Sequence, residues 1–307
     1  MAGNATGSHR KASATHLTHG AGPPPTPPMS EPVPSSRYPI PRSWKKSIAK
    51  ETRQLLQASL VRLSAGPIPV KAEGFKGTFE IEPSSDLFSR LWFHGDYEPE
   101  LRDLMLSHID PQRDVIDVGA NIGLFSVLFS HHAPRVLAVE PTPRAHSLLL
   151  RNLARNGCGE KVIAVPKALS AAPGRLTMQT VPGREEYSTV GKLEHRAAVG
   201  SSHNEIEVEA VTLDSLVESH GFNPGFIKID VEGGEGSVLK GALRTLEKYR
   251  PVVLAELSES LLRSCGSSVS EVLSILRGLG YRLTDPQGGE PGSREYGDVL
   301  AIPEAGA

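Results

Sequence analysis

Short apolar segments alternate with helical patterns from residue 114 onward. Alternation of this kind is typical of a parallel sheet wrapped by helices, and it predicts an α/β core. The candidate strands are Val115 to Val118, Val136 to Val139, Val162 to Pro166, Ile227 to Val231 and Val252 to Leu257.

Two of the intervening helices begin with recognisable signals. Thr142 followed by Pro143 suits an N-cap and the first helical position. Ser268 with Glu271 has the spacing of a capping box and predicts a helix from Val269 to Leu279. These signals support helices after the second and fifth strands.

The alternation is interrupted between Leu176 and Leu213. This region contains strand-like sequence, notably Ile206 to Val211, but little helical periodicity. We therefore expect an antiparallel pair of strands inserted before the fourth parallel strand.

The chain before the core divides into two segments. Residues 1–44 are rich in Pro, Ser, Thr, Gly and Ala and predict a disordered tail. We expect residues 45–93 to form an extension of helix and strand packed on the core, and residues 94–307 to form the main domain. Leu55, Leu56 and Leu60 lie at near-helical spacing among basic residues, which predicts an amphipathic helix over residues 45–63. A basic helix that binds a membrane surface or a partner is the alternative.

A small-residue turn follows the first candidate strand and precedes a helix from Ile122 to about Ser130. Gly119 has no Cβ, so a ligand can approach its backbone, and the helix start offers N–H groups. A dinucleotide fingerprint would need glycine at positions 121 and 124, where the chain has Asn121 and Leu124. NAD and FAD are therefore poor candidates for this turn.

The spacing resembles the D/E-x-G-x-G-x-G turn of class I methyltransferases, which bind S-adenosyl-L-methionine. Asn121 takes the place of the middle glycine, and Asp117, Gly119, Ala120 and Gly123 complete the predicted cofactor turn. This cofactor has no pyrophosphate, which relaxes the need for glycine. Asp117 is placed to face the cofactor's ammonium group, or it could tie the loop by hydrogen bonds.

Two later positions extend the predicted cofactor site. Glu140 ends the second strand about twenty residues after the turn, where an acidic side chain can accept both ribose hydroxyls. Ala168 follows the third strand, where such folds commonly line the adenine. Small residues in a loop need no functional cause, so Ala168 is the less specific of the two.

Four blocks resemble the FkbM-type methyltransferase family, over about residues 94–302. They are Tyr97 to Glu100, Asp117 to Gly123, Glu140-Pro141 and Ile227 to Glu235. The last block, IKIDVEGGE, is the most specific, with Gly234 where the family often has alanine. The resemblance implies a class I methyltransferase with a Rossmann-like α/β fold, a mostly parallel seven-stranded sheet with helices on both faces. It also implies, typically, O-methylation of hydroxyls on sugars, glycans or natural products.

An alcohol acceptor needs a carboxylate or His within hydrogen-bond reach to take its proton. Asp230 ends the fourth strand, at the edge of the sheet where ligands bind, and is our first candidate for this role. Glu232 is the second, and Lys228 shares a strand face with Asp230 and could pair with it. Alternatively, Asp230 or Glu232 caps the helix predicted from about Gly234 to Lys248.

Glu256 ends the fifth strand and is expected beside Asp230. A carboxylate pair there could hold Mg²⁺, which uses oxygen ligands, although the sequence does not establish this metal. Glu98 belongs to a segment that could fold across the cofactor or only brace the core.

Three further sites are candidates for the acceptor side. His94 and His203 lie outside the predicted elements and are available as bases, although an isolated loop His is more often incidental. Tyr187 to Thr189 lies in the inserted region and could line the acceptor pocket.

Composition narrows the class of protein. The 307 residues carry a net charge of -2 and a pI of about 6.6, which disfavours a nucleic-acid substrate. Cys158 and Cys265 show no metal-binding spacing, and a reducing cytoplasm fits best. No segment approaches the roughly 18 apolar residues of a membrane span, and no export signal is expected. N- or C-methylation and a non-catalytic binding module stay open as alternatives.

Overall fold

The computed structural model describes residues 42–304 except 65, 185–186, 191–202 and 292–295, and for residues 42–49 it describes the backbone only. Residues 1–41 of the predicted disordered tail therefore lie outside the described residues. The chain divides into two compact units, Met1–Ser47 and Ile48–Ala307, and the account below concerns the second.

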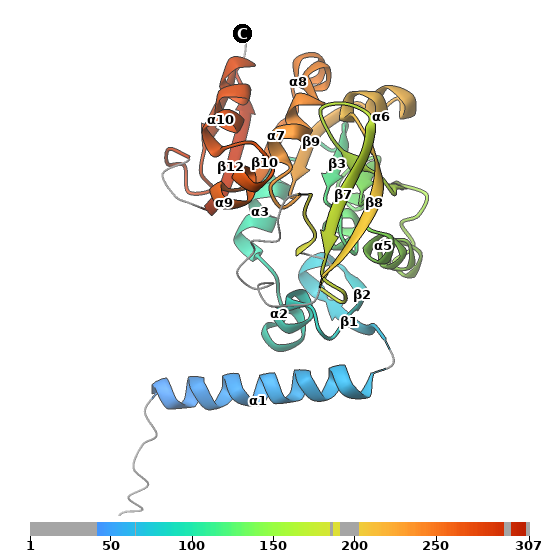
Figure 1. Ribbon diagram of the computed structural model, residues 1–307, viewed down its shortest axis with the longest axis vertical. Coiled ribbons are helices and arrows are strands. Elements are labelled where there is room, and N and C mark those ends of the chain that lie inside the picture. Colours follow the sequence, from blue (N-terminus) through green and yellow to red (C-terminus); the bar gives the residue numbers. More distant parts are fainter. Residues whose placement is uncertain (1–41, 65, 185–186, 191–202, 292–295, 305–307) are drawn as a thin grey trace, which may run out of the picture. The chain divides into compact units, whose positions relative to one another are not determined.

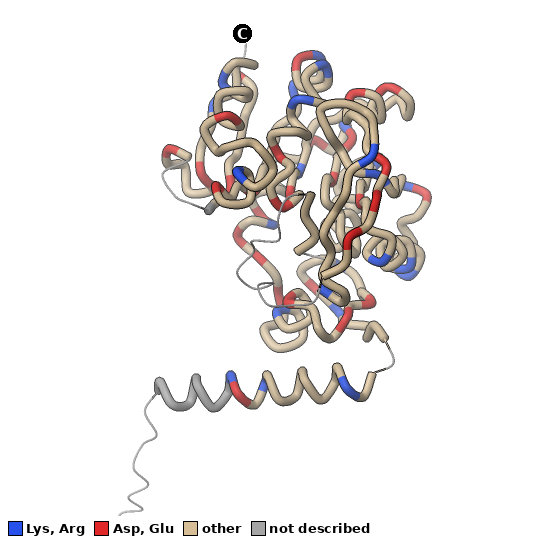
Figure 2. Tube along the Cα trace, viewed as in Figure 1, with Lys and Arg blue, Asp and Glu red and all other residues tan. Residues whose placement is uncertain are grey.

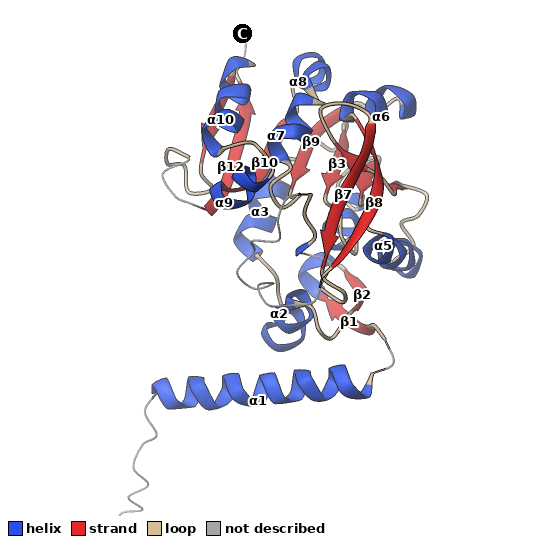
Figure 3. Ribbon diagram, in the orientation of Figure 1, coloured by secondary structure: helices blue, strands red, loops and turns tan. Residues whose placement is uncertain are grey.

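A seven-stranded sheet forms the centre of this unit (Figure 3). Within this sheet, β12 is the only described strand that runs antiparallel to the others, so the sheet is mostly parallel. A mostly parallel seven-stranded sheet is what the family resemblance led us to expect. The strand order is β11 (Tyr281–Thr284), β12 (Tyr296–Pro303), β10 (Val252–Ser258), β9 (Pro224–Ile229), β3 (Asp114–Val118), β4 (Val136–Val139) and β5 (Val162–Val165).

The five strands predicted from the sequence all form, with one correction that affects the site. The fourth was expected to run from Ile227 to Val231, but β9 begins at Pro224 and ends at Ile229. Asp230 therefore lies in the turn after the strand. Its backbone N–H still donates to the carbonyl of Val118, which holds the turn against β3.

Hydrophobic clusters cover both faces of the sheet, as expected when helices pack on each side. Ile116 of β3 belongs to the cluster that contains residues of α6 (Leu213–His220), α7 (Glu235–Lys240), α8 (Leu243–Tyr249) and α10 (Val269–Gly278). Val115 belongs to the cluster that contains residues of α3 (Pro99–Ser107), α4 (Leu124–Ser130) and α5 (Pro143–Arg155). Alternate residues of one strand thus point to opposite layers. The short helix α9 (Glu259–Ser264) follows β10.

The single helix expected from Gly234 to Lys248 is wrong. Two helices, α7 and α8, are separated at Gly241. A Cβ on Gly241 would lie 2.1 Å from the carbonyl oxygen of Ser170. The helix therefore breaks where the loop after the third parallel strand crosses it closely.

The inserted antiparallel pair is confirmed. Strands β7 (Gly174–Thr180) and β8 (Asn204–Val211) pair along their whole length. The short strand β6 (Ala168–Leu169) adds to β8 in parallel and makes a separate three-stranded sheet. Figure 1 shows this pair beside the main sheet, near α5.

The extension before the core is a hairpin followed by a helix. Strands β1 (Ile68–Ala72) and β2 (Gly77–Ile81) pair around the short helix η1 (Glu73–Phe75), and α2 (Asp86–His94) follows. Asn152 of α5 joins the hairpin to the core, because its side chain accepts from the N–H of Glu80 and donates to the carbonyl of Ile122.

The predicted amphipathic helix forms as α1 (Arg42–Leu63), but its packing on the core is limited. Gln57 donates to the carbonyls of Pro83 and Ser85. Leu60 packs against the hydrophobic cluster that contains residues of β1. Leu55 and Leu63 are 70% and 83% exposed, so the expected burial of the leucine stripe is wrong for these residues. Figure 2 shows Lys and Arg residues near both ends of the part of α1 whose side chains are described.

No helix in the described part of the chain is long and apolar enough to cross a membrane.

Candidate active site

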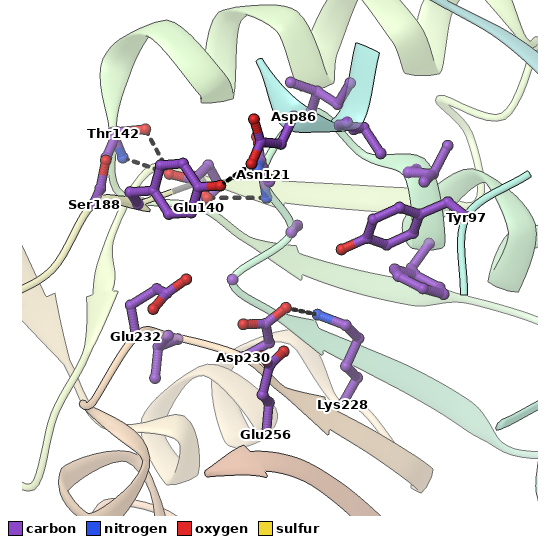
Figure 4. A pocket seen from close by; sticks show the side chains of 18 of the residues that line it. Asp86, Tyr97, Asn121, Glu140, Thr142, Ser188, Lys228, Asp230, Glu232 and Glu256 are labelled. Atoms are coloured by element: carbon purple, nitrogen blue, oxygen red, sulfur yellow. Dashed lines mark hydrogen bonds and ion pairs between the residues drawn. The ribbon is translucent and has the colours of Figure 1, made fainter. Parts of the chain in front are cut away.

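A cavity of about 310 Å³ lies at the carboxyl ends of the parallel strands (Figure 4). Open α/β sheets bind ligands at this edge. The turns after β3, β4 and β9 contribute most of its wall, and α2, the segment at Tyr97 and the inserted region complete it. The polar lining residues are Asp86, Arg90, Tyr97, Glu98, Asn121, Glu140, Thr142, Tyr187, Ser188, Lys228, Asp230, Glu232 and Glu256.

The turn after β3 forms the wall of the cavity, with Gly119, Ala120 and Asn121 lining it. Gly119 has φ +77°, and a Cβ there would lie 1.8 Å from the carbonyl oxygen of Asp230. Asn121 also has positive φ, +48°. The turn therefore requires glycine at 119 because two loops of the site touch through their backbones.

Three residues that the sequence assigned to the cofactor are absent from the described cavity wall: Asp117, which is described below, Gly123 and Ala168. Gly123 has φ +86°, and a Cβ on it would lie 2.5 Å from Cδ1 of Leu149, so it makes room for α5. Ala168 lies buried in β6 and packs with Met178 and Val208. Packing accounts for the positions of Gly123 and Ala168.

Glu140 reaches the cavity from the end of β4 and ties two turns together. Its Oε2 accepts from the N–H of Asn121 at 2.9 Å. Its Oε1 accepts from the N–H and the hydroxyl of Thr142 at 2.8 and 2.7 Å. Thr142 is the N-cap residue of α5, as predicted, but its hydroxyl binds Glu140 and makes no capping hydrogen bond to the helix. Burial raises the pKa of the Glu140 carboxyl, against the effect of these hydrogen bonds.

Asp117 is fully buried behind the cavity wall. Its Oδ2 accepts from the hydroxyl of Ser126 at 2.6 Å, whereas its Oδ1 has no hydrogen-bond partner among the described residues. Burial raises the pKa of Asp117, and the nearby ammonium of Lys228 opposes that shift. The side chain thus ties α4 to β3.

Lys228 pairs with Asp230, as the sequence suggested. The Nζ atom lies 3.0 Å from Oδ2 of Asp230 and 3.9 Å from Oδ1 of Asp117. Burial disfavours its charge, but the two carboxylates outweigh burial and raise the pKa of Lys228. Its ammonium also lies over the ring of Phe125, 5.3 Å from the centroid. Lys228 therefore stays charged and holds Asp230 at the cavity (Figure 4).

The turn after β9 is held by Glu235, a residue to which the sequence gave no role. Its Oε1 accepts from the N–H groups of Val231 and Gly233. Burial raises the pKa of Glu235 to about 7. The acid that binds the N–H groups before α7 is thus Glu235, while Asp230 and Glu232 line the cavity.

A group of carboxyls surrounds Asp230. Glu256 of β10 lines the cavity, and in the sheet it pairs with Asp298 of β12. Burial, and then the charge of Asp230, raise the pKa of Glu256 to about 10. Burial and neighbouring acids also raise the pKa of Asp298 to about 6 and that of Glu98. The position of Glu256 at the end of the fifth strand predicted its place beside Asp230. Asp298 was not predicted, because its position depends on the pairing of β12 with β10.

The inserted region closes one side of the cavity. The hydroxyl of Tyr187 donates to Asp86, and Thr189 donates to the carbonyl of Glu232 at 2.7 Å. Ser188 lines the cavity, and its buried hydroxyl has no hydrogen-bond partner in the described part of the chain. The predicted placement of Tyr187 and Ser188 at the pocket therefore agrees with the geometry.

The two candidate histidines lie elsewhere. His94 ends α2 and contacts the side chain of Arg53 at 3.3 Å. His203 is exposed at the start of the segment before β8. Neither belongs to the described cavity wall. Across the described ranges, no group of three or more His, Cys, Asp or Glu side chains could hold a metal ion, so the structure gives no support for Mg²⁺.

Comparisons with known proteins point to one family. The family described as the methyltransferase FkbM domain matches residues 117–283. The hexuronic acid methyltransferase AglP of Haloferax volcanii is 26% identical over 215 residues, 68% of this chain and 82% of that protein. The methyltransferase sdnD of Sordaria araneosa is 32% identical over 139 residues, 45% of this chain and 48% of that protein.

A solved structure of an FkbM methyltransferase from Methylobacillus flagellatus KT covers 63% of this chain and 44% of its own, with 18% identity and a TM-score of 0.42.

Proposed function

We propose that this chain, which belongs to the methyltransferase FkbM domain family, methylates a hydroxyl of a sugar, glycan or natural-product small molecule. Membership of the family makes it an S-adenosylmethionine-dependent methyltransferase. The oxygen acceptor is the finer proposal. The observation that carries it is the carboxylate of Asp230, which Lys228 holds at the cavity beside the cofactor turn.

The residues of the cavity fit the methyl donor. Glu140 lines the cavity, and its Oε2, which accepts one hydrogen bond, has acceptor capacity left for a ribose hydroxyl, whereas its Oε1 already accepts two. Gly119 to Asn121 present the backbone of the turn, and Asp117 supports that turn from behind by binding Ser126. We assign these residues to S-adenosylmethionine. When bound, this cofactor supplies a methyl group on a positively charged sulfur for in-line transfer.

Asp230 is our candidate general base. Lys228 binds its Oδ2, and we assign Oδ1 to the acceptor hydroxyl. As the bond from the acceptor oxygen to the methyl carbon forms and the bond from that carbon to sulfur breaks, the hydroxyl proton passes to Asp230. Lys228 orients the carboxylate throughout, and Glu235 fixes the turn that carries it.

The curated relatives support the acceptor class. The name of the relative AglP states a hexuronic acid as its substrate, and hexuronic acids are hydroxylated carbohydrates. At 26% identity this supports a carbohydrate-like acceptor for the present chain without specifying the sugar.

The experiment is a transfer assay with methyl-labelled S-adenosylmethionine and a panel of neutral, amino and acidic sugars. We expect label in a product that survives mild alkali, because a methyl ether is stable where a methyl ester is hydrolysed. Asp230→Asn should lower turnover about 100-fold or more and keep cofactor affinity within about twofold. Asp103→Asn, at a 67% exposed side chain, is the matched control. Near-normal turnover of Asp230→Asn would show that Asp230 is not the general base and has a structural role.

A further inference from the structure

The cavity is strongly acidic. Of the residues the structure describes, those with a carboxylate on its wall are Asp86, Glu98, Glu140, Asp230, Glu232 and Glu256, whereas only Arg90 and Lys228 bring a cation. Asp86 pairs with Arg184, which lies outside the wall, and the side chains of Glu98 and Asp230 are partly exposed. The remaining excess of negative charge in a partly buried cavity is still unfavourable unless a cation or protons compensate it. The wall is therefore built for a ligand that does not add negative charge.

Both cations on the described wall already lie against carboxylates. Lys228 lies between Asp230 and Asp117. Arg90 lies 3.8 Å from Glu98, and its guanidinium lies over the ring of Tyr97 at 5.3 Å. An anionic acceptor would have to displace one of these pairs, and a displaced carboxylate would stay in the cavity without its partner.

The acids concentrate on the side of Asp230. Figure 4 shows Glu232 and Glu256 on either side of Asp230, across the cavity from Glu140. Burial and the charge of Asp230 raise the pKa of Glu98, against the effect of Arg90, and raise the pKa of Glu256 to about 10. This is the side where the proposed base would meet the acceptor.

An independent observation points to a polar ligand in the same cavity. The side chain of Ser188 lines the wall, the residue is 9% exposed, and its hydroxyl has no hydrogen-bond partner in the described structure. Buried hydroxyls are usually hydrogen-bonded, so this group is suited to a hydroxyl or amine of a bound molecule.

We infer that the acceptor is a hydroxylated amine, with an amino sugar as its carbohydrate form, and that Glu98 and Glu256 select it by binding its ammonium group. The inference rests on the proposed O-methylation. An ammonium forms charge-assisted hydrogen bonds with carboxylates and relieves their mutual repulsion. A uronic acid would add a further carboxylate to the cavity. On this point we expect this chain to differ from the relative named for hexuronic acid.

The test is a calorimetric titration of the full chain saturated with S-adenosylhomocysteine. The probes are glucosamine, glucose and glucuronate, in one buffer at pH 7. We expect glucosamine to bind at least tenfold more tightly than glucuronate, with glucose between them. Glucose or glucuronate binding as tightly as glucosamine would overturn the inference, and so would the absence of saturable glucosamine binding.

Two variants test whether Glu98 and Glu256 bind the ammonium group. Glu256→Gln and Glu98→Gln should each lower the preference for glucosamine over glucose at least threefold, while glucose affinity stays within about twofold and reports an intact cavity. Glu100→Gln, at an exposed position two residues from Glu98, should change neither affinity. An unchanged preference in both Glu98→Gln and Glu256→Gln contradicts the assignment.

The proposed function can fail separately from this inference. If S-adenosylhomocysteine does not bind, or if no sugar of any charge accepts a methyl group in the transfer assay, the proposed function is wrong. If neutral and acidic sugars are methylated as well as amino sugars, only the inference about the ammonium is wrong.

Discussion

Single residues at the turn after β3 have little freedom to change. Gly119 combines φ +77° with a carbonyl oxygen 1.8 Å from where a Cβ would stand. Gly119→Ala must strain its backbone and push the Asp230 turn away, and we expect a loss of roughly 2 to 6 kcal/mol in the free energy of unfolding. Urea unfolding measures this loss.

Gly278→Ala is the control for that substitution. It lies on an exposed turn of α10, where an added Cβ meets no atom within 4 Å. Because alanine favours helix more than glycine does, this variant should be stabilised by up to about 1 kcal/mol. Equal effects of the two substitutions would show that the contact between Gly119 and Asp230 does not matter.

Glu256 should make stability depend on pH. Its pKa is raised from an ordinary 4.5 to about 10 by burial and then by Asp230, so the folded chain keeps a proton that the unfolded chain releases between these values. Stability therefore falls as pH rises through this window, by no more than about 1.4 kcal/mol per pH unit. Glu256→Gln removes this titration.

Unfolding of wild type and Glu256→Gln at pH 5, 7 and 9 measures this effect. The free energy of unfolding of Glu256→Gln should increase relative to that of the wild type as pH rises. That of Glu100→Gln should match the wild type at each pH. A stability difference between Glu256→Gln and wild type that stays constant from pH 5 to pH 9 is incompatible with a protonated Glu256.

Sequence spacing was sufficient to place Glu140 and Asp230 at the cavity, because each directly follows a strand of the sheet. It could not find Glu235, whose role depends on the turn before it folding back onto its carboxylate. Gly123 was assigned to the cofactor because a glycine pattern does not reveal whether a ligand or a neighbouring helix requires the missing Cβ.

At the scale of elements, α5 and the β1–β2 hairpin are joined through one fully buried side chain. Asn152 accepts from the N–H of Glu80 at 2.7 Å and donates to the carbonyl of Ile122 at 2.9 Å. Asn152→Ala should cost about 2 to 4 kcal/mol of unfolding free energy, because it leaves backbone groups without partners. Urea unfolding measures the cost.

Leu150→Ala serves as the comparison on the same helix. Leu150 is 48% exposed, and its truncation should change the free energy of unfolding by about 0.5 kcal/mol or less. If Asn152→Ala is no more harmful than Leu150→Ala, the hydrogen bonds of Asn152 do not hold the hairpin to the core.

Local signals placed most elements but not all their ends. The capping residue Ser268 does accept from the N–H of Glu271, as the sequence indicated. The Glu271 side chain pairs with Lys240 and Ser267, so only half of the expected capping box forms. The break at Gly241 escaped prediction because its cause, the carbonyl of Ser170, is distant in the sequence.

At the scale of the whole described unit, the alternation of strands and helices predicted the α/β core, and the resemblance to a family supplied the seven-stranded sheet. The hairpin β1–β2 and the strand β6 were not predicted. Both depend on pairing partners that local periodicity does not identify. The acidic character of the cavity is likewise a property of the fold, since the chain as a whole is close to neutral.

The central claim is that this cavity binds S-adenosylmethionine through Glu140 and the neighbouring turn. The most direct measurement is calorimetric titration of S-adenosylmethionine into the wild type, Glu140→Ala and Glu209→Ala, the last at a 59% exposed side chain. We predict 1:1 binding to the wild type and to Glu209→Ala. Glu140→Ala should bind about 5- to 150-fold more weakly, which corresponds to about 1 to 3 kcal/mol. A wild type that does not bind, or a Glu140→Ala variant with unchanged affinity, would contradict the account.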